Sequence, residues 1–148
     1  MPIEFKVRVA TEADAAPIAA LSRELGYPEE ARAIRERLGR ILARDDHRVY
    51  VAEGDGGEVC GWIQAHCSDI LESGFRVEIT GLVVSGRMRR RGVGRSLVAQ
   101  AETWASEISA GTIVVRSNAK RVESHEFYPA LGYLPSKTQV VYRKPTVI

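Results

Sequence analysis

Hydrophobic and polar positions follow two different periods along the first half of the chain, which predicts strands mixed with helices. Alternation over 5–9 predicts a first strand, and apolar residues at helical spacing predict helices over 14–25 and from Pro28 onward. Further on, short apolar runs predict three strands, over 48–53, 58–66 and 76–84, with a turn at 54–57 and a polar loop at 67–74.

The second half alternates helices with strands. Apolar residues recur at helical spacing from Val93 to Ile108, so a long helix is expected to end near residue 110. A strand is expected over 112–116, and its uninterrupted apolar run, Ile113, Val114 and Val115, predicts a buried central position. A short helix is expected over 122–131 and a last strand over 138–143. With no linker or repeat in 148 residues, we expect one α/β domain over 1–148.

A basic, glycine-rich segment separates the strand over 76–84 from the long helix. Residues 89–94 read RRRGVG, and the helix begins within them. Unpaired N–H groups and the macrodipole make a helix N-terminus attractive to anions, and glycine lets the backbone approach them closely. The segment therefore predicts a site for a polyphosphate.

Composition narrows the class of partner. The formal net charge is only +2, so the positive charge is local and a nucleic-acid partner is not expected. No apolar run approaches the length of a membrane span, and no signal-peptide pattern is present, so a membrane is not expected either. Cys60 and Cys67 lack metal-ligand spacing, which favours a reduced, cytoplasmic protein without a metal.

Two motifs and the element order together resemble the GNAT superfamily of N-acetyltransferases over nearly the whole chain. Arg89-x-x-Gly92-x-Gly94 is similar to the family's Arg/Gln-x-x-Gly-x-Gly/Ala loop, and the segment 127–133, FYPALGY, is similar to its later aromatic segment. The resemblance implies an α/β (α+β) GNAT fold: a mixed, mostly antiparallel, six- to seven-stranded sheet flanked by four helices.

The resemblance also implies acetyl-coenzyme A as the acetyl donor and cosubstrate. Its pantetheine arm would pair with the strand edge at Leu82, Val83 and Val84. Arg121 stands where many members place a coenzyme-binding asparagine, and Asn118, three residues earlier, is the candidate substitute, so either residue is left open as the contact. The diphosphate would be held by the loop and first helical turn, namely Arg89, Arg90, Arg91, Gly92, Val93, Gly94, Arg95 and Ser96.

Two residues are candidates for proton transfer. Glu78 resembles the strand-four glutamate of the histone-acetylating members and is the candidate base, directly or through water. The alternative is a structural glutamate paired with Arg76 or Arg116. Tyr128 is the candidate acid toward the coenzyme sulfur, and the alternative is a core tyrosine.

These residues suggest an N-acetyltransferase that transfers acetyl to a primary amine by direct attack. Asp69, Glu72 and Glu78 suggest that the acceptor is a small cationic molecule, although a solvated acidic loop explains them almost as well. Two alternatives stay open: a non-catalytic acyl-CoA-binding regulatory domain, and an enzyme that acetylates protein or peptide amines. Homodimers are common in the family, but no apolar stripe in this chain proves one.

Overall fold

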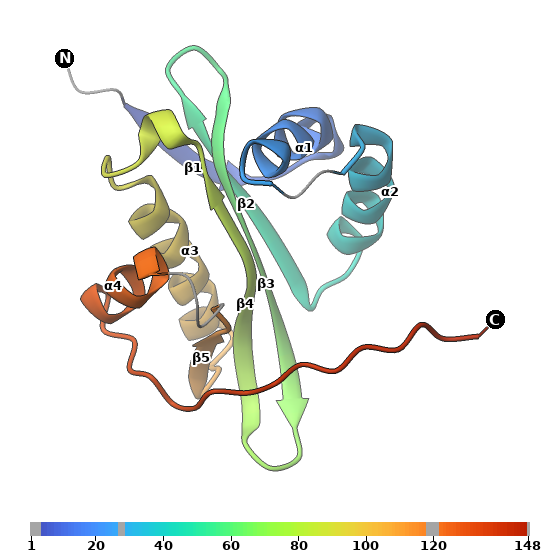
Figure 1. The fold of residues 1–148 in the computed structure, drawn as a ribbon, viewed down its shortest axis with the longest axis vertical. Helices are drawn as coiled ribbons and strands as arrows, with labels where there is room; N and C mark the ends of the chain where they lie inside the picture. Colours follow the sequence, from blue (N-terminus) through green and yellow to red (C-terminus); the bar gives the residue numbers. More distant parts are fainter. Residues whose placement is uncertain (1–3, 27–28, 118–121, 148) are drawn as a thin grey trace. The chain divides into compact units, whose positions relative to one another are not determined.

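The structure is a computed structural model that describes residues 4–26, 29–117 and 122–147 (Figure 1). Contacts divide the chain into two compact units, Met1–Arg116 and Ser117–Ile148, and each is described by itself. All strands assigned among the described residues lie in the first unit. The expected single domain stays a prediction.

The first unit contains one mixed sheet whose strands run in chain order. All neighbouring strands pair antiparallel except β4 and β5, which are parallel. The sheet therefore has the mostly antiparallel character that the resemblance implied. Its strands are β1 (Phe5–Val9), β2 (His47–Gly54), β3 (Val59–Ile70), β4 (Gly74–Val84) and β5 (Thr112–Val115).

Helices cover both faces of this sheet (Figure 1). On one face, α1 (Ala15–Glu24) and α2 (Ala31–Leu42) bury Ile18 and Leu38 in one cluster with Val49 and Val51 of β2. On the other face, α3 (Val93–Glu107) lies so close to β3 that a Cβ at Gly61 would be 3.1 Å from Val93 Cγ1. Apolar contact on both sides explains why the middle of β2 is buried on both faces.

The N-terminus of α1 is fixed by a partly buried ion pair between Arg8 and Asp14. A single 3-10 turn, Glu12–Asp14, leads into the helix, as the expected start near Asp14 suggested. The Asp14 carboxylate accepts two hydrogen bonds of 2.9 Å from Arg8 and one of 2.8 Å from the Thr11 amide. These bonds, above all those from Arg8, hold the pKa of Asp14 below its usual value.

The segment over 67–74 differs from its prediction. It was expected to be a polar loop, yet β3 continues to Ile70 and β4 begins at Gly74, with Ser68 opposite Arg76 and Asp69 opposite Phe75. The reason is cross-strand hydrogen bonding, which supports polar residues in a hairpin without an apolar pattern.

The second unit contains α4 (Val122–Ala130), so the described chain has the four helices expected. The expected strand over 138–143 is wrong, since no strand is assigned in the described part of this unit, and the sheet has five strands rather than six or seven. Alternation specifies which residues share a face, whereas a strand also requires hydrogen bonds from a neighbour. Asn118, Arg121 and the expected helix start at Pro28 lie outside the described residues.

Candidate functional site

The basic loop ends in an uncapped helix N-terminus. A 3-10 turn over Gly86–Met88 buries Met88 and leads into the loop, where Arg90 and Gly92 both have a positive φ, of 62° and 84°. The first bond of α3 runs from the Ser96 amide to the Gly92 carbonyl at 3.0 Å, and no side chain caps the helix. The amides of the first turn are therefore available to an anion.

The arginines of this loop are exposed, while the residue that begins the helix is not. Arg89, Arg90, Arg91 and Arg95 extend into solvent, whereas Val93 is 1% exposed. The side chain of Val93 therefore packs into the core and is not available to a ligand. The loop is also tied to α1, because the Gly86 amide donates a hydrogen bond of 3.0 Å to Glu24 Oε1.

One edge of β4 is unpaired beside this loop. β5 pairs with β4 only from Arg76 to Ile79, and Thr80 has no partner in β3, where the register shifts between Gln64 and Ala65. Beyond this bulge, Leu82, Val83 and Val84 pair with β3 alone among the described strands. Their outer backbone groups can therefore accept an extended ligand as an additional strand.

Glu78 lies on β4 just before the bulge and is held by arginines. Its Oε1 accepts a hydrogen bond of 2.5 Å from Arg116 Nη1 and lies 3.7 Å from Arg76 Nη2. The Glu78 side chain is 12% exposed, on the face opposite the buried Val77 and Ile79, as alternation predicted. The arginine pairing weighed as the structural alternative is thus present, and catalysis by Glu78 stays a prediction.

A row of polar residues crosses the sheet at the level of Glu78. His47 pairs with His66, and His66 pairs with Glu78, so their side chains share a face. Because His47 lies two residues before Val49, this is the face that α1 and α2 cover. Asp69 alternates to the opposite face from His66, so it does not join Glu78 in one acidic surface.

The two histidines are stacked and differ in their partners. Their ring centroids are 5.2 Å apart with 22° between the planes, and Gln64 Nε2 lies 3.4 Å from His47 Nδ1. Burial lowers the pKa of His47, and the nearby Asp46 only partly opposes this. The Nδ1 atom of His66 is buried without a hydrogen-bond partner among the described residues.

Sequence reasoning did not single out this histidine row. His47 and His66 lie far apart in the sequence and belong to no motif. Only the strand register brings them together, and the register depends on the turn and on which face is buried. The one local signal of this row was the alternation along β4, which places Glu78 on the face opposite Val77 and Ile79.

Tyr128 lies in α4 of the second unit within an aromatic cluster. Its ring packs edge-on against Phe127 at 5.0 Å and Tyr133 at 5.8 Å between centroids. Its carbonyl accepts hydrogen bonds from the amides of Leu131 and Tyr133 at the helix end. Its proposed proton transfer stays a prediction.

Cysteine and metal chemistry have little support in the described residues. Cys60 is 1% exposed, and burial raises the pKa of its thiol, which disfavours the nucleophilic thiolate. No group of three or more metal-ligating side chains gathers in the part of the chain that is described. Within the same residues, no helix is long and apolar enough to cross a membrane.

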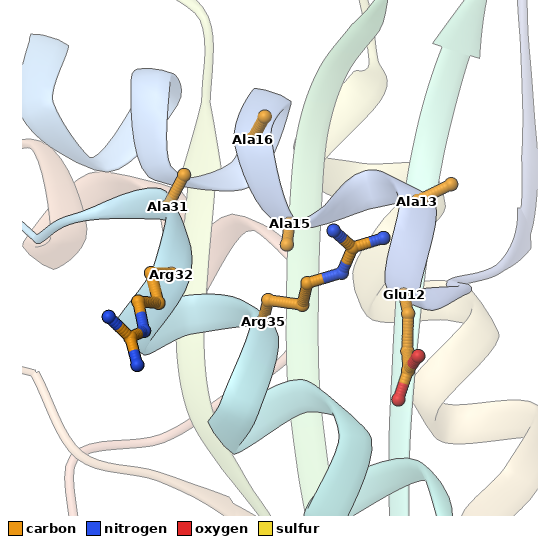
Figure 2. Close-up of a pocket in the computed structure, with 7 residues that line it drawn as sticks. All are labelled: Glu12, Ala13, Ala15, Ala16, Ala31, Arg32 and Arg35. Atoms are coloured by element: carbon orange, nitrogen blue, oxygen red, sulfur yellow. The ribbon is translucent and has the colours of Figure 1, made fainter.

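An open hollow of about 310 Å³ lies between the beginnings of α1 and α2 (Figure 2). It is lined by four alanines of the two helices and the preceding turn and by three charged residues, Glu12, Arg32 and Arg35. It is at the opposite end of α1 from Glu24, which contacts the basic loop. A helix of that length spans about 15 Å, so the hollow is separate from the loop.

Comparisons with known proteins agree with this geometry. The family model described as "Acetyltransferase (GNAT) family" matches residues 15–133. An aminoalkylphosphonate N-acetyltransferase of Salmonella typhimurium is 33% identical over 138 residues, which cover 92% of this chain and 88% of that protein. An aminoglycoside N(6')-acetyltransferase of Serratia marcescens is 29% identical over 123 residues, covering 80% of this chain and 82% of that protein.

Solved structures show the same fold. An aminoglycoside N-acetyltransferase in complex with coenzyme A aligns with a TM-score of 0.86 over 99% of this chain and 98% of that one, at 19% identity. Glucosamine-6-phosphate N-acetyltransferase from Arabidopsis thaliana aligns with a TM-score of 0.83 over 95% and 98%, also at 19% identity. With the family model spanning most of its length, the chain belongs to the acetyltransferase (GNAT) family.

Proposed function

We propose that this protein transfers an acetyl group from acetyl-coenzyme A to the primary amine of a small molecule by direct attack. The observation that carries the proposal is the unpaired edge of β4 at Leu82–Val84, next to the uncapped N-terminus of α3. An extended thioester arm with a diphosphate at one end fits these two features together.

Two segments of the chain bind different parts of the donor in this proposal. The segment from Arg89 to Ser96 binds the diphosphate, chiefly through first-turn amides that precede the bond from Ser96 to Gly92, and the free β4 edge positions the pantetheine arm. When bound, acetyl-coenzyme A supplies the activated acetyl group. A backbone amide of Leu82–Val84 is suited to stabilise the charge that develops on the thioester oxygen. Asn118 is proposed as a further contact, although it lies outside the described residues.

Two side chains move protons in this proposal. Glu78 removes a proton from the acceptor ammonium, because only the neutral amine can attack. Tyr128 returns a proton to the leaving sulfur. The proposal includes a single domain and a cytoplasmic location, which the free thiols of Cys60 and Cys67 support.

The acceptor is proposed to be a small molecule because the relatives named above act on small amines. Their names provide two acceptor classes to test first, aminoglycosides and aminoalkylphosphonates. The test is an acetyl-CoA-dependent thiol-release assay across a panel of amines that includes both classes and a lysine-containing peptide.

We expect turnover on at least one small amine, and a loss of about 10²-fold or more in kcat for Glu78→Gln and for Tyr128→Phe. Matched controls are Glu126→Gln and Tyr142→Phe, since both residues are exposed. An unchanged kcat in both test variants would contradict the roles assigned to Glu78 and Tyr128. Coenzyme A binding without turnover on any amine would favour the regulatory domain, and turnover on the peptide alone would favour protein acetylation.

A further inference from the structure

Positive charge exceeds negative charge around Glu78. Arg116 and Arg76 both face this one carboxylate, with Nη1 of Arg116 at 2.5 Å and Nη2 of Arg76 at 3.7 Å from Oε1. At the His47 end of the same row, Arg44 and Asp46 satisfy each other through hydrogen bonds of 3.0 and 2.9 Å. Among the described residues, the ion pairs of Arg76 and Arg116 thus share the single carboxylate of Glu78.

Two buried nitrogen atoms on either side of Glu78 also lack partners. Arg76 Nε and His66 Nδ1 have no hydrogen-bond acceptor or donor among the described residues. His66 is opposite Glu78 in the β3–β4 register, and Arg76 precedes Glu78 by two residues on the same face. Buried polar groups in folded proteins are nearly always satisfied, so unpartnered groups at neighbouring positions on one face are suited to a polar ligand.

We propose that the acceptor carries an anionic group in addition to its amine, and that Arg76, Arg116 and His66 bind this anion. The proposal rests on the acetyl transfer proposed above and specifies its acceptor: a small amino compound with a phosphonate, phosphate ester or carboxylate. A guanidinium binds such oxyanions through paired N–H groups, and limited exposure, 19% for the Arg76 side chain, strengthens the attraction.

This site would also release the candidate base. In the structure, Arg116 holds Oε1 of Glu78, the oxygen nearest to both guanidiniums. An acceptor anion that binds Arg116 takes the place of this carboxylate and frees it. Glu78 then accepts a proton from the acceptor ammonium, and the neutral nitrogen bonds to the acetyl carbon. The C–S bond breaks, and the departing thiolate gains one proton as the nitrogen loses its second.

Matched acceptors test the proposal. The anionic set is 2-aminoethylphosphonate, O-phosphoethanolamine and β-alanine, and the comparison set, which lacks an anionic group, is ethanolamine and propylamine. We expect kcat/KM to be on the order of 10-fold or more higher for at least one anionic acceptor than for either amine of the comparison set. An equal or higher kcat/KM for the comparison set would overturn the proposal.

Variants separate anion binding from structural support of Glu78. Because both arginines contact Glu78, the readout is the ratio of kcat/KM values. Arg116→Gln and Arg76→Gln should lower kcat/KM for the anionic acceptor by about 10-fold or more relative to kcat/KM for an acceptor without an anionic group. Arg116→Lys is the milder variant, because it keeps the positive charge at a position whose side chain is 56% exposed. Arg32→Gln changes another exposed arginine and is the control. An equal loss on both kinds of acceptor would show that the arginines only support Glu78, and would contradict the proposal.

A binding measurement keeps this inference separate from the question of turnover. With coenzyme A present, calorimetry should detect 2-aminoethylphosphonate, and Arg116→Gln should weaken its binding. Glu78→Gln should strengthen that binding, because the carboxylate competes for the same guanidiniums. If Glu78→Gln weakens it, or if Arg116→Gln has no effect, the anion site is wrong. If binding follows this pattern but no amine is acetylated, only the proposed function fails.

Discussion

His47 shows how a single residue in the polar row responds to its surroundings. The amide nitrogen of Gln64 is placed to donate to His47 Nδ1, which leaves the proton of a neutral ring on Nε2, 3.9 Å from Asp46. Burial disfavours the charged ring more than Asp46 favours it, so the pKa of His47 is lowered. The folded protein therefore prefers a neutral His47.

This preference makes stability depend on pH. Between the lowered folded pKa and the unfolded value of 6.5, the unfolded state binds more protons. The contribution of His47 to the free energy of unfolding is thus complete above pH 6.5 and falls as the pH drops below it. The slope for one group cannot exceed about 1.4 kcal/mol per pH unit.

Urea denaturation from pH 8 to pH 5 measures this effect. We expect His47→Gln to have a flatter pH profile than the wild type. His125→Gln, which changes an exposed histidine in α4, should keep the wild-type slope. Parallel profiles for wild type and His47→Gln would refute the assignment.

At the scale of the element, the start of α3 depends on one glycine. Gly92 has a φ of 84°, and a Cβ built on it meets no atom within 4 Å. Alanine there is strained by its backbone alone, at a cost of about 1 kcal/mol. The added methyl group would also project from the loop that is proposed to hold the diphosphate.

Gly57 is a matched control for this position. It has the same φ of 84° and the same open space, but it lies in the turn between β2 and β3. We expect Gly92→Ala and Gly57→Ala to lose similar stability in urea denaturation. Only Gly92→Ala should also weaken coenzyme A binding, by about 10-fold, measured by calorimetry. Equal affinities for coenzyme A in the two variants would exclude the loop as the binding element.

Helices and strands were predictable where the local sequence pattern determines the structure. They were missed where pairing with a neighbouring strand determines it. The apolar spacing of α3 and the glycine signature before it were sufficient to locate the helix and its N-terminus. The end of the β3–β4 hairpin nearest its turn was not predicted, because polar residues such as Ser68 and Asp69 are held there by cross-strand bonds. The same dependence on a neighbour explains the incorrect strand over 138–143.

The candidate site was also predictable only in part: residues adjacent in the sequence were found, and residues brought together by strand pairing were not. Motif residues from Arg89 to Ser96 lie together at the start of α3, since they are adjacent in the sequence. The alternative pairing of Glu78 with Arg76 or Arg116 is present, with both arginines engaged. The His47–His66 row was not predictable, because it exists only through the register of two antiparallel pairs.

At the scale of the whole molecule, the sheet and its helices converge on one function. The family model spans 15–133 and so runs from the first unit into the second. Antiparallel pairing from β1 to β4 builds a rigid sheet, and the short parallel β5 leaves the last residues of β4 unpaired on one side among the described strands. The uncapped α3 N-terminus is the proposed anion site beside this edge.

Calorimetry of the intact chain with coenzyme A, compared with pantetheine, tests the central claim most directly. Pantetheine can pair with the β4 edge but has no diphosphate for the amides at the start of α3. We expect coenzyme A to bind at least about 10-fold more tightly than pantetheine. No heat of binding with coenzyme A, or equal affinity for the two ligands, would contradict the proposed site.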